Sequence, residues 1–396
     1  MASVMVEPRA SASSGFPQPL KLTATTSGYL DAIRALASLA VMFGHWRGLF
    51  FVDYPNIEPA NTTSAVKALY ALTGFGHQAV MIFFVLSGFF VSSSILRRLT
   101  KSDWSWRDYA IDRGVRLYVV LLPGLVLGFF WDFIGSHYCN AAGIYSAPLI
   151  PFGDGIVSEQ LTWTAFFGNL LFLQSGLTTV FGSNGPLWSL FNEFWYYVLF
   201  PVLLSLILAA QRRSIKAICG YSAVAVLSAA LLGSQLSGFL VWLAGFLIAL
   251  TARHWAFGNS RKFLAAAYSG VLGAISGLCL FAARTHGSWI GSDIAVGLTF
   301  ALFLHGFLQL QLPLAAFGLA MAKTFVGFSF SLYVLHFPIL LFIRASLIPG
   351  ARWQPDWTHV TYGIGISIVV ILYSYLIAKM TEFKTGTVRT WIRDIL

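Results

Sequence analysis

Ten long apolar stretches dominate this sequence of 396 residues and limit what it can fold into. Each is close to the roughly 20 residues that an α-helix needs to cross the hydrocarbon core of a bilayer. Only 10% of the residues are charged and 57% are hydrophobic, whereas a soluble domain carries roughly 25% charged residues. The sequence therefore predicts an all-α integral membrane protein and excludes a soluble enzyme, a disordered protein and a disulfide scaffold. The stretches are residues 29–51, 77–96, 115–134, 186–209, 214–232, 237–252, 263–283, 290–310, 325–346 and 358–379.

The distribution of Lys and Arg predicts how these helices are oriented. With the N-terminus inside and ten spans, 19 Lys and Arg residues fall on the inner side and five on the outer side, with Arg34 left near the start of the first helix. Because basic residues are retained on the cytoplasmic side, both termini are predicted to be cytoplasmic. This topology fails if a short span such as 237–252 does not cross. Topology and anionic membrane lipid then account for the net charge of +10, and no nucleic-acid partner is expected.

The chain divides into three predicted parts. Residues 1–27 are rich in Ser, Thr, Ala and Pro and form a flexible cytoplasmic tail. Residues 28–380 form the membrane domain with about ten transmembrane helices, and residues 381–396 form a second cytoplasmic tail. No metal site is expected, because the cysteines are odd in number and lack the spacing of metal ligands; they are Cys139, Cys219 and Cys279.

One further apolar segment, residues 161–175, is too short and too polar at its edges to cross the membrane. We predict an interfacial or re-entrant helix there.

The first helix carries two polar side chains that are costly at membrane depth. Arg34 and His45 lie eleven positions apart, which is close to three helical turns, so both project from nearly the same face about 16 Å apart along the axis. One interpretation is that Arg34 extends to the headgroups and His45 satisfies a buried hydrogen bond. The other is that both belong to a functional site, and the two are equally supported.

Three residues in later helices raise the same question. Glu193 lies in the run GPLWSLFNEFWYYVLFP and needs a cation or a hydrogen-bond donor, either in a structural ion pair or in a site. Trp188, at the start of that run, fits an interfacial aromatic belt better than a stacking site. His336 precedes Pro338 in SFSLYVLHFPILL, where packing and function are equally supported.

Arg113 and Arg116 are separated by one helical turn at the cytoplasmic start of the third helix. This spacing places two guanidinium groups on one face, where they could hold phosphate groups in bidentate fashion. Simple anchoring at the inner surface explains any isolated Arg pair as well. Other basic residues crowd the same inner loop, which favours a large anionic ligand from the cytosol.

These motifs, in this order, resemble membrane-bound acyltransferase family 3. Its members O-acylate, and mostly O-acetylate, bacterial surface polysaccharides, peptidoglycan, lipid-linked sugars and some antibiotics. The similar blocks are LDAIRALASLAVMFGHW with its Arg-x10-His signature, HQAVMIFFVLSGFFVSSSILRR, RGVRLYVVLLP with its Arg-x-x-Arg motif, FFGNLLFLQ followed by GPLWSLFNEFWYYVLFP, and FSFSLYVLHFPIL. The residues at the motif positions are Arg34, His45, Arg113, Arg116, Glu193 and His336.

The resemblance implies a transferase of the bacterial plasma (inner) membrane, with acyl-CoA, most often acetyl-CoA, as cosubstrate and no bound cofactor. The acceptor is a hydroxyl of a carbohydrate, such as a surface polysaccharide or its lipid-linked precursor. His45 is then the expected general base, or else the site of an acyl-histidine intermediate. Arg113 and Arg116 are expected to hold the phosphates of CoA, and Arg34 to extend that path or orient the thioester.

Glu193 is expected to orient a histidine or raise its basicity, which makes it the third member of the catalytic group with His45 and Arg34. On the acceptor side we assign His336 and Trp188 as substrate-binding residues. We expect acceptor selectivity to lie in the outer segment 135–185, which contains Tyr138, Tyr145, Phe152, Asp154 and Trp163. Its aromatic side chains either stack on sugar rings or form a folded interfacial cap.

The sequence also departs from the family pattern. Ala32 replaces a frequent Gly after Asp31, and Met81 stands in a stretch where the family usually has an acidic residue. The chain ends soon after the last predicted span, so no appended SGNH hydrolase-like domain is expected, and transfer occurs directly or through a partner protein of polysaccharide assembly. The alternative function is a polytopic transporter of a sugar-lipid or organic anion, although no repeat relates the two halves.

Overall fold

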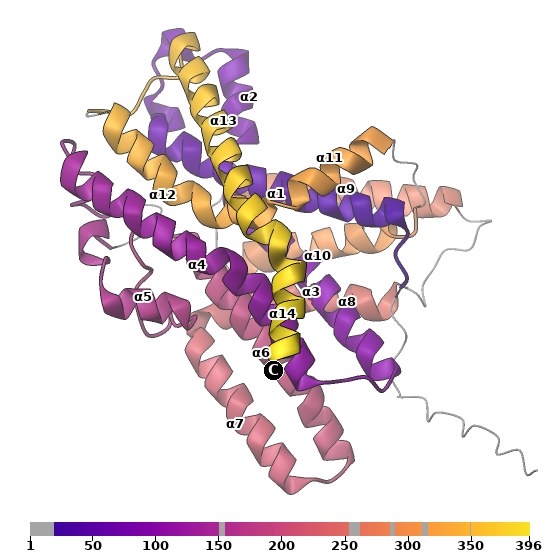
Figure 1. Cartoon of the computed structure of the whole chain (residues 1–396). Coiled ribbons are helices and arrows are strands. Elements are labelled where there is room, and N and C mark those ends of the chain that lie inside the picture. The colour runs from indigo at the N-terminus through magenta and orange to yellow at the C-terminus, as the bar shows by residue number, and fades with distance from the viewer. Residues whose placement is uncertain (1–19, 150–154, 253–261, 286–289, 311–315, 349) are drawn as a thin grey trace, which may run out of the picture.

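The computed structural model describes residues 20–149, 155–252, 262–285, 290–310, 316–348 and 350–396, and over these ranges the chain is helical and contains no β-strand. The predictions for Phe152 and Asp154, and for the tail up to residue 19, concern residues outside these ranges. Figure 1 shows the long helices crossing one another in a layered bundle. The helices are α1 (Ala24–Phe50), α2 (Ser64–Leu72), α3 (Gly76–Thr100), α4 (Trp106–Tyr138), α5 (Trp163–Leu170), α6 (Leu187–Gln211), α7 (Ile215–Leu232), α8 (Leu236–Thr251), α9 (Lys262–Thr285), α10 (Ile290–Phe307), α11 (Ala316–Val326), α12 (Ser329–Leu347), α13 (Trp357–Met380) and α14 (Thr385–Ile395).

Every predicted apolar stretch contains a helix, which confirms the all-α membrane class. Within the described ranges, seven segments are long and apolar enough to cross a membrane: 64–100, 106–138, 187–211, 215–251, 263–285, 329–347 and 357–395. Helix α1 is not among them, because Arg34, His45 and Arg47 lower its hydropathy. The count of ten spans and the cytoplasmic placement of the termini therefore stay predictions.

Helix boundaries differ from the expected ones at the start of α1 and within the stretch 325–346, whereas the segment 161–175 is as short as predicted. Helix α1 already begins at Ala24, where the Thr23 hydroxyl accepts a hydrogen bond from the Thr26 amide and caps the helix. The stretch 325–346 is divided between α11 and α12. The division falls at Gly327, where an added Cβ would press against the ring of Phe383. The segment 161–175 contains only α5, whose eight residues are too short to cross a bilayer.

Helices α3 and α8 approach each other closely through two glycines. A Cβ added to Gly88 would overlap the carbonyl of Trp242, and a Cβ added to Gly245 would overlap the carbonyl of Val85. Small residues at such positions let helix backbones approach closely inside a membrane, where packing rather than hydrophobic burial drives association. This crossing fixes α3, which contributes to each of the cavities described below.

The outward faces of several helices are apolar, as expected for lipid contact. Helix α7 exposes Val226 and Leu227, and α9 exposes Leu278 and Phe281. Helix α13 exposes a row of branched side chains: Ile364, Ile368, Leu372 and Leu376. Large exposed apolar surfaces of this kind are rare on soluble proteins, so the structure agrees with the membrane class.

Arg344, near the end of α12, fastens that helix to the end of α1. It is only 6% exposed, and its guanidinium group donates to the carbonyls of Leu49 at 3.1 Å, Gly350 at 2.8 Å and Ile348. Three carbonyl acceptors satisfy a buried cation without a carboxylate. Arg344 therefore has a structural role, and it holds together the two helices that carry His45 and His336.

The C-terminal segment is not an unstructured tail. After α13 a short 3₁₀ turn (Glu382–Lys384) leads into the amphipathic helix α14, which packs against α4. Figure 1 shows α14 in yellow, continuing the direction of α13 across the start of α4. An amphipathic helix with basic residues is typical of a membrane surface, and here it places carboxylate and guanidinium groups beside the predicted cytoplasmic site.

Candidate functional site

The two histidines of the predicted site are hydrogen-bonded to each other. Nδ1 of His45, in α1, lies 2.7 Å from Nε2 of His336, in α12. Their rings lie nearly parallel, with centroids 5.0 Å apart, and the ring of Phe337 meets His45 edge-on. His336 is fully buried, whereas His45 is half-buried. The structure thus joins a residue predicted to be catalytic with one predicted to bind the acceptor.

The backbone of α12 determines which nitrogens carry protons. Nδ1 of His336 lies 2.9 Å from the carbonyl oxygen of Leu332, and because a carbonyl can only accept, Nδ1 must be the donor. In the neutral ring, Nε2 of His336 is then an acceptor, so Nδ1 of His45 donates to it. Nε2 of His45 is left with the lone pair. This is the arrangement of a general base held in one tautomer by a second ring.

The predicted phosphate-binding arginines line a cavity of about 340 Å³. Arg113 and Arg116 come from α4, Arg34 from α1 and Arg97 from the end of α3. Arg113 lies over the rings of Tyr109 and Tyr197, 5.7 Å and 5.5 Å from their centroids. Its buried Nε has no hydrogen-bond partner within the described parts of the chain, so a donor remains for an anion. We call this space the arginine cavity.

Glu193 lies in the arginine cavity and not beside a histidine. Its Oε1 accepts hydrogen bonds from the hydroxyls of Ser87, at 3.0 Å, and Tyr197. Tyr197 and Glu193 both interact electrostatically with Arg116. The residue that orients His45 is therefore His336, whereas the sequence suggested Glu193 for this role. Glu193 is placed to balance charge and position Tyr197 between the arginines.

Two further carboxylates balance the buried guanidinium groups. Asp31 lies 3.7 Å from Arg34, one helical turn earlier. Glu382, in the turn before α14, accepts hydrogen bonds from the amide and hydroxyl of Ser331, both at 2.8 Å. It also interacts electrostatically with Arg116 and Arg34. The C-terminal segment thus delivers a counter-ion to the arginine cavity, which no local sequence pattern indicated.

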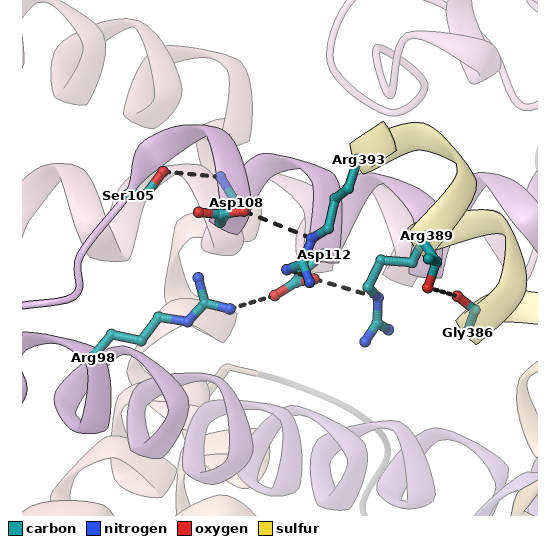
Figure 2. Close-up of polar contacts among 8 residues, drawn as sticks. Arg98, Ser105, Asp108, Asp112, Gly386, Arg389 and Arg393 are labelled. Carbon is teal, nitrogen blue, oxygen red and sulfur yellow. Dashed lines mark hydrogen bonds and ion pairs between the residues drawn. The ribbon is translucent and has the colours of Figure 1, made fainter. Parts of the chain in front are cut away.

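A network around Asp112 attaches α14 next to this cavity, one residue before Arg113. Figure 2 shows Asp112 on α4 between Arg98 of α3 and two arginines of α14. Arg98 lies at 2.6 Å, Arg393 at 2.9 Å and Arg389 at 3.3 Å. Arg393 also reaches Asp108 at 3.6 Å. These basic residues of α3 and α14 are therefore engaged with the carboxylates of Asp108 and Asp112.

A second cavity, of about 310 Å³, lies on the other side of Tyr333 and contains His45. It shares Val80 and Tyr333 with the arginine cavity. The Tyr333 hydroxyl pairs with Ser189 at 2.5 Å and donates to the Pro186 carbonyl at 3.1 Å, which ties α12 to the start of α6. We call this space the middle cavity. His45 and the arginines thus line adjoining cavities with a common wall, and His336 lies buried behind His45.

Trp188 stands in the wall of the middle cavity, where it stacks on His77 with centroids 6.1 Å apart. The local sequence pattern favoured an interfacial belt for Trp188, although it was also assigned to substrate binding, and sequence reasoning did not assign His77 to the site. It also missed Asp293, whose Oδ1 lies 2.9 Å from Nε2 of His77. Asp293 opens α10, and its position near a helix start gave no signal that it faces α3.

A family model described as an acyltransferase domain, that of acyltransferase family 3, matches residues 27–379. The chain belongs to acyltransferase family 3. The match covers the helices that carry both histidines, the cavity-lining arginines, Glu193 and Trp188, and it ends before Glu382 and α14.

Two curated proteins are similar to part of the chain. Nodulation protein 10 of Rhizobium leguminosarum bv. viciae is 27% identical over 177 residues, 44% of this chain and 44% of that protein. The acyltransferase MdmB of Streptomyces mycarofaciens is 28% identical over 177 residues, 44% of this chain and 38% of that protein. The chain therefore matches less than half the length of either relative. No solved structure matches this acyltransferase-family chain.

Proposed function

We propose that this protein is a membrane O-acyltransferase. It takes an acyl group, most simply acetyl, from cytoplasmic acyl-CoA and transfers it to a hydroxyl of a carbohydrate acceptor, a surface polysaccharide or its lipid-linked precursor. The plasma membrane of a bacterium is the corresponding location. The observation that carries the proposal is that His45, hydrogen-bonded to His336, lines a cavity that shares a wall with the arginine cavity.

The arginine cavity suits the donor. CoA is a cytosolic polyanion, and Arg97, Arg113 and Arg116 belong to the ends of α3 and α4 that are predicted to be cytoplasmic. Guanidinium groups bind phosphate bidentately and stay charged when half-buried. With the phosphates held there, the thioester end of the molecule can extend past Tyr333 into the middle cavity.

The histidine pair suits the chemistry. Nε2 of His45 accepts the proton of an acceptor hydroxyl as its oxygen attacks the thioester carbonyl carbon. The new carbon–oxygen bond forms, the carbon–sulfur bond breaks, and the proton on His45 passes to the departing CoA thiolate. His336 steadies the imidazolium formed in between, because its Nε2 still accepts from Nδ1 of His45. A thioester is already activated, so positioning and one base are sufficient.

The test measures thiol release and ester formation by the purified protein in detergent micelles, with acetyl-CoA as donor. His45→Ala should lower acetyl-CoA turnover on the order of 100-fold or more while CoA binding, measured by calorimetry, is unchanged. The matched control is His137→Ala. His137 is an exposed histidine whose Nδ1 is hydrogen-bonded to Ser136 and to the Phe133 carbonyl, both within α4. Near-normal turnover in His45→Ala would remove the assignment.

The acceptor class is tested in cells. Mass spectrometry of surface polysaccharides from cells with and without the gene should show an acetyl group that disappears with the gene. If no glycan loses an acyl group, the carbohydrate acceptor is wrong even where the purified protein cleaves acetyl-CoA.

A further inference from the structure

A third cavity, of about 240 Å³, adjoins the middle cavity and shares His77 and Trp188 with it. Its lining comes from the starts of α3, α6 and α10 and from the turn before α8, at Gln235. The topology predicted from Lys and Arg places these four positions toward the outer side. We call this space the outer cavity. A molecule bound there lies next to the cavity that His45 lines, because His77 and Trp188 border both spaces.

Polar groups in the outer cavity are arranged for a neutral ligand that both donates and accepts hydrogen bonds. His77 and Asp293 form a pair at 2.9 Å. Asn192 is only 1% exposed and donates to Gln235 Oε1 at 3.2 Å. Its own Oδ1 is buried and has no hydrogen-bond partner within the described parts of the chain. A buried amide oxygen left this way costs about 1–3 kcal/mol, so a ligand that donates a hydrogen bond to it is favoured.

Aromatic rings supply the rest of the wall. Trp188 stacks on His77 and meets Phe84 edge-on, with centroids 6.2 Å apart. A flat indole beside amides and a carboxylate is suited to a ligand with apolar faces and polar edges, because each side of the ligand then finds a matching surface. A sugar ring has this construction: C–H groups cover its faces and hydroxyls surround its edge.

We propose that the outer cavity is a binding site for a neutral, hydroxyl-rich sugar ring. The ring would stack on Trp188 and form hydrogen bonds with the His77–Asp293 pair and with the unpaired Oδ1 of Asn192. Its role as the acceptor subsite rests on the proposed function, whereas binding of the sugar does not. The Asp293 carboxylate disfavours anionic ligands. A purely hydrocarbon ligand would leave the buried Oδ1 of Asn192 without a hydrogen bond, and sites built to bind hydroxyls reject such ligands strongly.

The binding test uses saturation-transfer difference NMR on the full-length protein in detergent micelles. The probes are methyl α-glucopyranoside, methyl α-galactopyranoside and methyl α-mannopyranoside. At least one should give a transfer signal with the unmodified protein. The signal should fall at least tenfold with Asn192→Leu, which removes the unpaired Oδ1 at nearly constant side-chain size. It should fall equally with His77→Phe, which keeps an aromatic ring at this position but loses the hydrogen bond to Asp293.

The matched control is His359→Phe, because His359 also pairs with an aspartate, at 2.6 Å from Asp356, but lines none of these cavities. This variant should keep the signal. Absence of a signal from all three probes with the unmodified protein overturns the proposal. So does an unchanged signal in both Asn192→Leu and His77→Phe.

Turnover separates this inference from the proposed function. With acetyl-CoA as donor, Asn192→Leu should raise the KM for the pyranoside at least tenfold and leave the KM for acetyl-CoA unchanged. A sugar signal without any acetyl-CoA cleavage would support the sugar site and contradict the transferase. Equal effects of Asn192→Leu on both KM values would contradict the assignment of this cavity to the acceptor.

Discussion

Nδ1 of His45 and Nε2 of His336 lie 2.7 Å apart although the two residues are 291 positions apart in the sequence. Nδ1 of His336 in turn donates to the carbonyl oxygen of Leu332, so two hydrogen bonds run in one direction from His45 to the backbone. Because these bonds have a direction, they hold His45 in the tautomer whose Nε2 is basic. His336 is thus a positioning residue for His45.

Replacing His336 should separate positioning from binding. We expect His336→Ala to lower kcat on the order of 100-fold with the KM for acetyl-CoA unchanged. His336→Gln should retain much more activity, because the Gln carbonyl oxygen can accept from Nδ1 of His45. Steady-state thiol-release kinetics of both variants provide the measurement. Equal activity of the two variants would show that the hydrogen bond does not matter.

Removing the guanidinium pair should weaken donor binding. The double variant Arg113→Ala with Arg116→Ala loses charged hydrogen bonds worth about 1.5–3 kcal/mol each, so the Kd for CoA should rise at least tenfold in calorimetry. Its remaining affinity should also depend less on salt. The control is Arg212→Ala with Arg213→Ala, a pair in the exposed turn between α6 and α7. A similar loss in that control would remove the specific role of the cavity.

Glu382 should oppose donor binding, since it is a negative charge near Arg34 and Arg116. Glu382→Gln keeps an oxygen that accepts from Ser331 and removes the charge. The affinity for CoA should increase roughly 3- to 10-fold, as read by calorimetry at low salt. Glu58→Gln, at an exposed site far along the chain from α14, should have no effect. Weaker CoA binding in Glu382→Gln would mean that its carboxylate organises the arginines instead.

The two aspartates that hold α14 should differ in importance. Asp112 is 18% exposed and contacts three arginines, whereas Asp108 is 42% exposed and contacts one. Asp112→Asn should destabilise α14 by about 2 kcal/mol, and Asp108→Asn by less than about 1 kcal/mol. Hydrogen exchange of the α14 amides in micelles measures both. The opposite order would contradict the network drawn in Figure 2.

The α3–α8 crossing should tolerate no side chain at Gly88. Gly88→Ala places a Cβ against the Trp242 carbonyl, and overpacking of this kind costs about 1–3 kcal/mol. Thermal unfolding in micelles should therefore begin at a lower temperature. Gly277→Ala, at a helical glycine with open space around it, should be neutral or stabilising, because Ala favours a helix by about 1 kcal/mol. Equal midpoints for both variants would argue against the close crossing.

The sequence alone was enough to predict the helices and the residues that are costly within them. Long apolar stretches must become helices in a bilayer, because each backbone group has to find its hydrogen-bond partner within its own segment. For the same reason the few ionisable residues at membrane depth, such as Arg34, His45 and Glu193, stood out as candidates. The topology rule was equally local, since it needs only the positions of Lys and Arg.

The partners of these residues depended on the tertiary structure. Helix packing brought His336 to His45, Ser87 to Glu193, and the C-terminal Glu382 to the arginines. Asp293 likewise reached His77 from a different helix. The periodicity of a single helix defines which face a side chain occupies but not which distant helix lies against that face. Apolar sequence therefore determined which segments become helices and which polar groups are costly, whereas the lateral packing of those helices decided how each costly group is satisfied and which groups share a cavity.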